Sequence, residues 1–272
     1  MNETTPSVPA ARPRERPPTP SGAVDGVLHW ARWIRRLLIG CIGFEVLWII
    51  LDQTISIYGW IDDTDVQELF HLSMEENAPT WFASTQATFV GLTIFAIYFV
   101  TRAQGAPRGT RRGWLTLGFF FAYLGLDDTA KVHERLGSVV GDLFEAQIVP
   151  IRGLLGIDTY DWQLFLAPLF ALMGLFMLVF LWRHFGRYAL RTYLVLGLAC
   201  YAVAVSIDFL EGTGTFFFNL GEAVSMDEDF VRHNFKVTEE ILEMFGTTMF
   251  WQGFLHFLAR ISDGFRLRLT RV

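Results

Sequence analysis

The stretch WLTLGFFFAYLGLDDTAKVHERLG, residues 114–137, joins an apolar run directly to a group of charged residues. Its first part is as apolar as a membrane-spanning helix, and its last part contains acids, bases and a histidine. Because about 20 apolar residues are enough to cross a bilayer, the stretch predicts a membrane-spanning helix over 114–134. The charged residues then lie at the outer end of that helix.

The rest of the chain has the composition of a multi-pass membrane protein. Of its 272 residues, 52% are hydrophobic and only 18% are charged, and the apolar residues gather in long blocks. Each block is close to the length that crosses a bilayer. We therefore predict an all-α bundle of six membrane-spanning helices, at about 35–57, 81–101, 114–134, 162–182, 192–211 and 238–258.

Basic residues lie on one side of this predicted bundle. Seventeen of the 22 lysines and arginines precede the first span or follow the second, fourth and sixth spans. Since basic links stay in the cytoplasm, both termini are predicted to be cytoplasmic in a plasma-membrane protein. Residues 1–34 are expected to be a disordered Pro- and Arg-rich tail with an interfacial lead, 35–260 the membrane domain, and 261–272 a basic tail.

Motifs for several other functions are missing from the sequence. It contains no glycine-rich phosphate loop, nucleophile elbow or nucleotide fingerprint. Its two cysteines, Cys41 and Cys200, are too few for a disulfide framework or a thiolate zinc site. We expect membrane lipids as partners, together with a lipid-like or other small-molecule substrate or an ion, and no nucleic acid.

Acidic side chains from different predicted spans fall at one depth. At ~1.5 Å per residue from the inner boundary, Asp52, Asp127, Asp128, Asp208 and Glu243 come out at roughly 20–25 Å. A buried carboxylate is costly in a membrane, so such acids face the bundle interior and mark a site or a pathway. These acids are predicted to line one polar chamber in the outer half of the bundle.

Helical phase selects candidates for that chamber. Asp127 and Glu134 are seven residues apart and share a face if the helix is continuous. Carboxylates and a histidine from facing helices are typical ligands of a divalent ion, which here could be Zn, Fe, Mn, Mg or Ca. We predict Asp127, His133, Asp208 and Glu243 as ligands of such an ion.

A bound metal would lower the pKa of a water molecule for attack on a lipid-like substrate at the outer leaflet. In that hydrolase Glu134 or Glu240 would be the general base, and Ser84 would be a nucleophile or would position the metal-bound water. The alternative is a cation or proton-coupled transporter that uses the same acids, with Glu45 as a deep relay. A scaffold whose acids only tie helices together also remains open.

Each candidate also has a structural interpretation. Asp127 could pair with Lys131 at the helix end, and Glu240 could favour the helix dipole in a first turn. Ser84 could belong to the start of its helix. The histidines His71 and His233 have no partner that is visible in the sequence.

Three segments resemble a set of bacterial six-span membrane proteins that carry an LD[DE]xxxxHE-type segment and have no established activity. The segments are NAPTWFAS (77–84), LGLDDTAKVHERLG (124–137) and EEILEMFGTTMFW (239–251). This resemblance implies the six-span topology and no mechanism.

The chain also shows a weak similarity to the alkaline ceramidase-like membrane hydrolases, which use a serine, an aspartate and histidine ligands for zinc. Ser84, Asp127 and His133 resemble parts of that pattern. The paired histidines on a late helix are absent, and Glu240 and Glu243 stand there instead. This similarity therefore implies no activity for the chain.

Overall fold

The computed structural model describes residues 25–27, 30–143, 161–213, 216–262 and 266–268. The chain divides into two compact units, Met1–Leu28 with Phe265–Val272, and His29–Gly264. In the first unit, strand β1 (Asp25–Val27) pairs antiparallel with strand β2 (Arg266–Arg268). Most of the two predicted tails lies outside the described residues.

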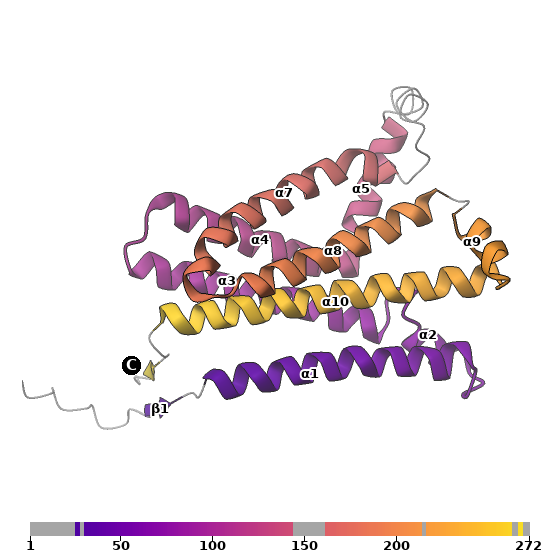
Figure 1. The fold of residues 1–272 in the computed structure, drawn as a ribbon, viewed down its shortest axis with the longest axis horizontal. Helices are drawn as coiled ribbons and strands as arrows, with labels where there is room; N and C mark the ends of the chain where they lie inside the picture. Colours follow the sequence, from indigo (N-terminus) through magenta and orange to yellow (C-terminus); the bar gives the residue numbers. More distant parts are fainter. Residues whose placement is uncertain (1–24, 28–29, 144–160, 214–215, 263–265, 269–272) are drawn as a thin grey trace, which may run out of the picture. The chain divides into compact units, whose positions relative to one another are not determined.

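The described residues of the second unit, called the helical unit below, form helices and the links between them, as the sequence predicts. Each of the six predicted spans lies mostly on a long helix, although the first and third run past the end of theirs (Figure 1). The elements in chain order are α1 (Trp30–Leu51), the π-helical turn η1 (Asp52–Ile57), α2 (Thr64–Phe70), α3 (Ala78–Ala103), α4 (Arg108–Ala130), α5 (Val132–Leu143), α7 (Asp161–Phe185), the 3-10 turn η2 (Gly186–Tyr188), α8 (Arg191–Gly212), α9 (Phe216–Val224) and α10 (Glu228–Ile261).

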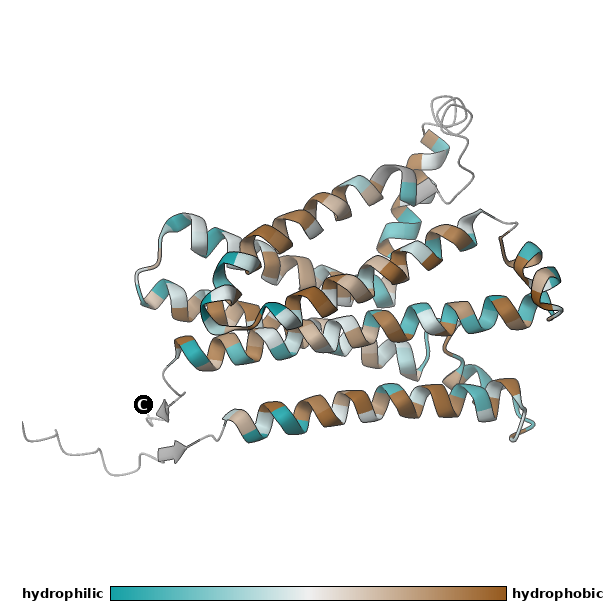
Figure 2. Cartoon of the chain, in the orientation of Figure 1, coloured by the Kyte–Doolittle hydropathy of each residue, from teal (hydrophilic) through white to brown (hydrophobic). Residues whose placement is uncertain are grey.

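Within the described residues, three segments are long and apolar enough to cross a membrane, by length and composition: Ala78–Ala103, Leu166–Tyr188 and Arg191–Gly212. They coincide with the second, fourth and fifth predicted spans. The other three predicted spans lie on α1, α4 and α10, which carry Glu45, Asp127 and Glu243 in their interiors. Figure 2 shows this contrast between the mostly hydrophobic α7 and α8 and the mixed surface of α10.

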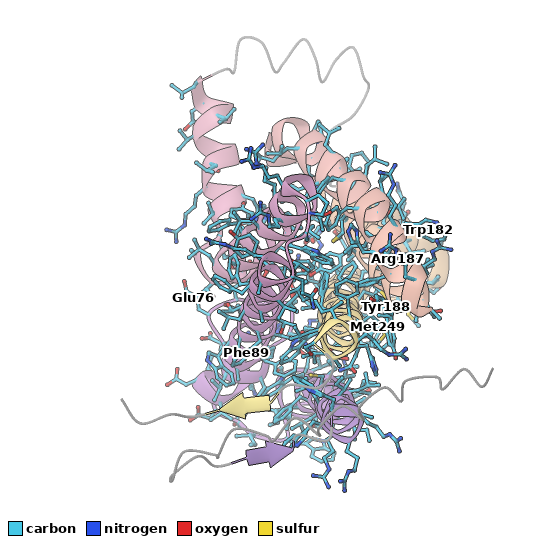
Figure 3. The ribbon with its side chains drawn as sticks, turned by 90° about the vertical axis from the view of Figure 1, so that its left-hand side faces the viewer. Glu76, Phe89, Trp182, Arg187, Tyr188 and Met249 are labelled. Atoms are coloured by element: carbon cyan, nitrogen blue, oxygen red, sulfur yellow. The ribbon has the colours of Figure 1, made fainter. Side chains whose placement is uncertain are left out.

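Helix α10 holds the helical unit together, because it packs against α1, α3, α8 and α9. Side chains fill the space between the helices (Figure 3). Aromatic rings dominate the largest core, where Phe121 of α4 packs edge-on against Phe250 and Phe254 of α10. Burying large rings stabilises such a contact through both area and ring geometry.

Glycines allow α3 and α4 to approach closely. A Cβ atom on Gly125 would lie 2.5 Å from Thr88 Oγ1 and 2.8 Å from the backbone oxygen of Ser84. We expect Gly125→Ala to lower the free energy of unfolding by about 1–3 kcal/mol, because overpacking pushes the two helices apart. Chemical denaturation in detergent would measure the change. Gly43→Ala is the control, since nothing lies within 4 Å of a Cβ there. An equal loss in both variants would contradict the packing explanation.

The third predicted span ends earlier than its sequence indicates. Helix α4 stops at Ala130, Lys131 adopts a left-handed conformation with φ 48°, and α5 begins at the next residue. The continuous helix that would place Asp127 and Glu134 on one face is therefore wrong. The Asp127 carboxylate accepts the backbone N–H of His133 at 2.8 Å and so stabilises the turn. Glu134 lies exposed in the first turn of α5.

Candidate functional site

Three residues from separate parts of the chain meet at one end of α10. Asp52 opens η1, His71 follows α2, and His233 lies in the second turn of α10. His233 Nε2 is 2.9 Å from Asp52 Oδ2, and the two imidazole rings are 4.9 Å apart between centroids. One ligand atom from each residue lies within 4.8 Å of the others. This group has the spacing needed to hold a metal ion.

The Asp52 carboxylate is held firmly at 0% exposure. Its Oδ1 accepts the backbone N–H of Leu72 at 2.9 Å, and its Oδ2 accepts Gln53 Nε2 at 3.1 Å. A buried carboxylate needs such partners to offset the loss of water. The π-helical turn that begins here is a feature found often at functional sites.

Ser73 connects the two histidines. Its Oγ lies 3.0 Å from His71 Nδ1 and 3.2 Å from His233 Nδ1. With a metal ion in place of the proton between His233 Nε2 and Asp52, the Ser73 hydroxyl oxygen could accept hydrogen bonds from both Nδ1–H groups, which would leave both Nε2 atoms as metal ligands. Burial lowers the pKa of His71, and the neighbouring His233 lowers it further, so the neutral imidazole that binds metals is favoured.

A cavity of about 490 Å³ opens beside this group. That volume is typical of a small-molecule site. A ligand in the cavity would reach both imidazoles, while Asp52 does not line it. The lining residues are Ile57, His71, Ser73, Glu211, Asp229, Phe230, Arg232, His233 and Lys236.

A second group with metal-ligand spacing consists of Asp208, Glu211 and Glu239, whose carboxylate oxygens lie within 4.8 Å of one another. This group already contains a cation, because Lys236 Nζ lies 2.9 Å from Glu239 Oε1 and 3.9 Å from Glu211 Oε2. Burial alone would lower the pKa of Lys236, but the surrounding carboxylates, Glu239 first, raise it above its usual range. The ammonium group is therefore the resident counter-charge of these acids.

The predicted metal ligands are distributed over neighbouring groups. His133 Nδ1 is 2.7 Å from Asp127 Oδ2, so these two side chains form a pair between α4 and α5. Asp208 accepts Gln163 Nε2 at 2.8 Å and interacts electrostatically with His133. Of the four predicted ligands, only Asp208 belongs to a group with metal-ligand spacing within the described ranges.

The fourth predicted ligand, Glu243, lies among acids of two helices. It interacts electrostatically with Glu240 and with Asp128 of α4. Asp128 in turn interacts with Glu240, Asp127 and His133. Acids of α4 and α8 thus lie near acids of α10. Asp52, predicted for the same chamber, lies with His71 and His233 instead.

Ser84 lies in the contact between α3 and α4. Its Oγ donates to the backbone oxygen of Gly125 and accepts Thr129 Oγ1 at 2.8 Å. Both partners belong to α4. These bonds give Ser84 a packing role in this structure.

The sequence does not predict the pairing of His71 and His233 with Asp52. One signal is present in the sequence, because Asp52 belongs to the predicted outer polar layer and both histidines lie in links between predicted spans. What the sequence lacked was any measure of how η1, the link after α2 and the start of α10 approach one another. That approach depends on tertiary packing.

Comparison with known proteins identifies a family and no activity. No curated protein and no solved structure matches the chain. The similarity to alkaline ceramidase-like hydrolases therefore has no support beyond the residues quoted for it. A family model described as "Domain of unknown function (DUF8692)" matches residues 39–258, a range that includes Asp52, His71 and His233. Because this match covers most of the chain, the protein belongs to the DUF8692 family.

Proposed function

We propose that this protein is a six-span plasma-membrane hydrolase with both termini in the cytoplasm and a divalent metal ion bound by Asp52, His71 and His233. The observation that carries the proposal is the meeting of these three side chains beside a cavity that both histidines line. Two histidines and one carboxylate are the ligands of many catalytic zinc sites and of non-haem iron sites. They suit a borderline ion better than magnesium or calcium, which prefer oxygen ligands.

Such a ligand set supports hydrolysis because three protein ligands leave a coordination position open. A water molecule in that position has a lowered pKa, and the ion can also polarise a carbonyl or phosphoryl oxygen of the substrate. His71 and His233 both line the cavity, so a substrate there would meet the metal from the side of the imidazoles. Asp52, buried behind them, would fix the ion without occupying the substrate space.

Aromatic and apolar residues near the cavity favour a lipid-like substrate. Ile57 and Phe230 contribute apolar surface to the cavity itself. Tyr58 and Trp60, just after η1, are 70% and 77% exposed. Exposed tyrosine and tryptophan at a helix end are typical of the membrane–water interface. A cavity at that level can receive a headgroup while the apolar chain stays in the bilayer.

The direct test is elemental analysis of protein purified without chelator. We expect about one divalent ion per chain, removed by dialysis against a chelator and restored by adding the metal. Asp52→Asn should lower the metal content, because the neutral amide is a much weaker ligand than a carboxylate. Protein that is folded, free of metal and unable to take up zinc, iron or manganese would exclude the proposal.

Replacing Ser73 gives a second test, because its hydroxyl group lies within hydrogen-bond distance of both histidines. Ser73→Ala should weaken metal binding about 10–100-fold, the usual effect of losing a partner that orients metal ligands. Ser73→Thr should restore most of the affinity because the hydroxyl returns. Ser138→Ala is the control, since that hydroxyl donates only to the backbone of its own helix at 3.0 Å. Unchanged metal affinity in Ser73→Ala would show that Ser73 does not orient the ligands.

A cation or proton-coupled transporter is the second candidate, favoured by the acids that α4, α8 and α10 bring together. Asp128, Glu240 and Glu243 interact with one another inside the helical unit. Acids placed in this way are typical of ion pathways. Cation flux in liposomes that is lost in Glu243→Gln, with no metal-dependent hydrolysis, would support this function instead.

A further inference from the structure

Glu45 of α1 lies 3% exposed inside the helical unit, where it contacts two other long helices. Thr248 Oγ1 of α10 donates to Glu45 Oε1 at 2.6 Å. Gln86 Nε2 of α3 donates to Thr248 Oγ1 at 2.6 Å and lies 3.4 Å from Glu45 Oε1. Three helices therefore meet at one buried carboxyl group.

The hydrogen-bond partners of Glu45 within the described residues, Thr248 and Gln86, carry no charge. The neighbouring Cys41 thiol, one turn earlier in α1, is also close to Gln86 and Thr248. A carboxylate that is buried among neutral groups pays a large desolvation cost unless a positive charge accompanies it. Neutral donors alone do not supply that charge.

Buried amide groups on the same helices have unused hydrogen-bonding capacity. Gln86 Oε1 has no partner among the described residues, and neither Nε2 nor Oε1 of Gln252 has one. Gln252 is 1% exposed and follows Thr248 by four residues, so it lies one turn along the same face of α10. Each unsatisfied buried polar group costs about 1–3 kcal/mol. Bound water or a bound ion would remove that cost.

We propose that Glu45, Gln86, Thr248 and Gln252 form a binding site for one monovalent cation inside the helical unit. The cation is either a proton on Glu45, with water at the amides, or a sodium ion held by the carboxylate and the amide oxygens. Both forms neutralise Glu45 and satisfy the free amide atoms. The site contains no histidine and shares no residue with the Asp52–His71–His233 centre or with the cavity lining.

The site can be tested with dicyclohexylcarbodiimide, an apolar reagent that reacts with protonated carboxyl groups. The carboxyl O–H adds across one C=N bond, the proton moves to nitrogen, and the adduct rearranges to a stable N-acylurea with no leaving group. Mass spectrometry of the digested protein should find the adduct on Glu45. A labelling rate that falls at least about 10-fold as the pH rises would identify a proton site. Protection by sodium chloride but not by choline chloride would identify a sodium site.

Gln252→Leu provides the second measurement. If Gln252 binds the ion or its water, this variant should lower the thermal midpoint and change the labelling rate of Glu45. If Gln252 is merely unsatisfied, removing its amide should leave the midpoint equal or higher. Two results together would overturn the proposal. Glu45 would be unlabelled, or labelled at a rate that changes with neither pH nor salt, and Gln252→Leu would not lower the thermal midpoint. Neither measurement uses the divalent metal, so its outcome is independent of the proposed hydrolase.

Discussion

Replacing His233 with alanine is expected to remove the stoichiometric divalent metal from the purified protein. His233 Nε2 lies 2.9 Å from Asp52 Oδ2, and its other ring nitrogen shares Ser73 with His71. The variant leaves one histidine and one carboxylate, which is too few ligands for a tight site. We expect affinity to fall by more than about 100-fold, beyond the 10–100-fold effect of losing an orienting partner. Elemental analysis and competition with a chelator would measure the loss.

The control for this variant is His256→Ala on the same helix. His256 stacks on Tyr193 with ring centroids 5.6 Å apart and belongs to no group with metal-ligand spacing in the part of the chain that the structure describes. Its replacement should leave the metal content unchanged. If His233→Ala keeps its metal and Asp208→Asn loses it, the ion belongs to the acids predicted from the sequence. That result would reassign the metal and leave the question of hydrolysis open.

The helices of this protein were largely predictable because their signal is local. A block of about 20 apolar residues indicates a helix wherever it occurs in the chain, and each of the six blocks lies on a long helix. Membrane crossing is less evident from composition for α1, α4 and α10. Buried acids, such as Glu45 in α1, Asp127 in α4 and Glu239 in α10, lower the hydropathy of these segments although they lie inside the helical unit. A helix that buries a polar face inside the helical unit can therefore have a sequence that is not purely apolar.

The break at Lys131 was not predictable from turn residues, because no glycine or proline interrupts the stretch DDTAKVHE. In the structure a side-chain hydrogen bond explains the break, because Asp127 Oδ1 accepts the backbone N–H of His133 at 2.8 Å. Such a bond competes with the helix at the point where the left-handed residue ends it. Residue spacing does not give relative side-chain directions across the break. Asp127 and Glu134 therefore do not share a helix face as predicted.

The candidate metal centre was beyond the reach of the sequence for a different reason. Asp52 and His233 are separated by 181 positions, and their contact depends on the rotation of α10 against α1. Helical phase orders residues within one helix and says nothing about which face meets a neighbour. Depth gave partial information, because it placed Asp52 in the outer polar layer together with the other acids. The pairing itself required the packed structure.

Asp127→Asn should destabilise the protein and leave its metal content unchanged. The Asp127 carboxylate accepts the backbone N–H of His133 at 2.8 Å, His133 Nδ1 at 2.7 Å and the Tyr123 hydroxyl at 3.2 Å. Asparagine keeps one acceptor oxygen but turns the other into an amide, so the bond to the imidazole is lost. Hydrogen bonds to a charged group contribute roughly 1.5–3 kcal/mol, and we expect a loss of about 2 kcal/mol in the free energy of unfolding. Chemical denaturation in detergent would measure it.

Asp142→Asn is the matched control, because Asp142 is an exposed acid on α5 and should tolerate the same change with no measurable effect. The pair of measurements separates the two roles that Asp127 can have. A loss of stability with normal metal content assigns Asp127 to the junction between α4 and α5. A loss of metal with little change in stability would make it a ligand, as the sequence predicted, and would move the metal centre from Asp52 and His233 to the acids of α4. The same residue therefore decides between a structural turn and a catalytic site.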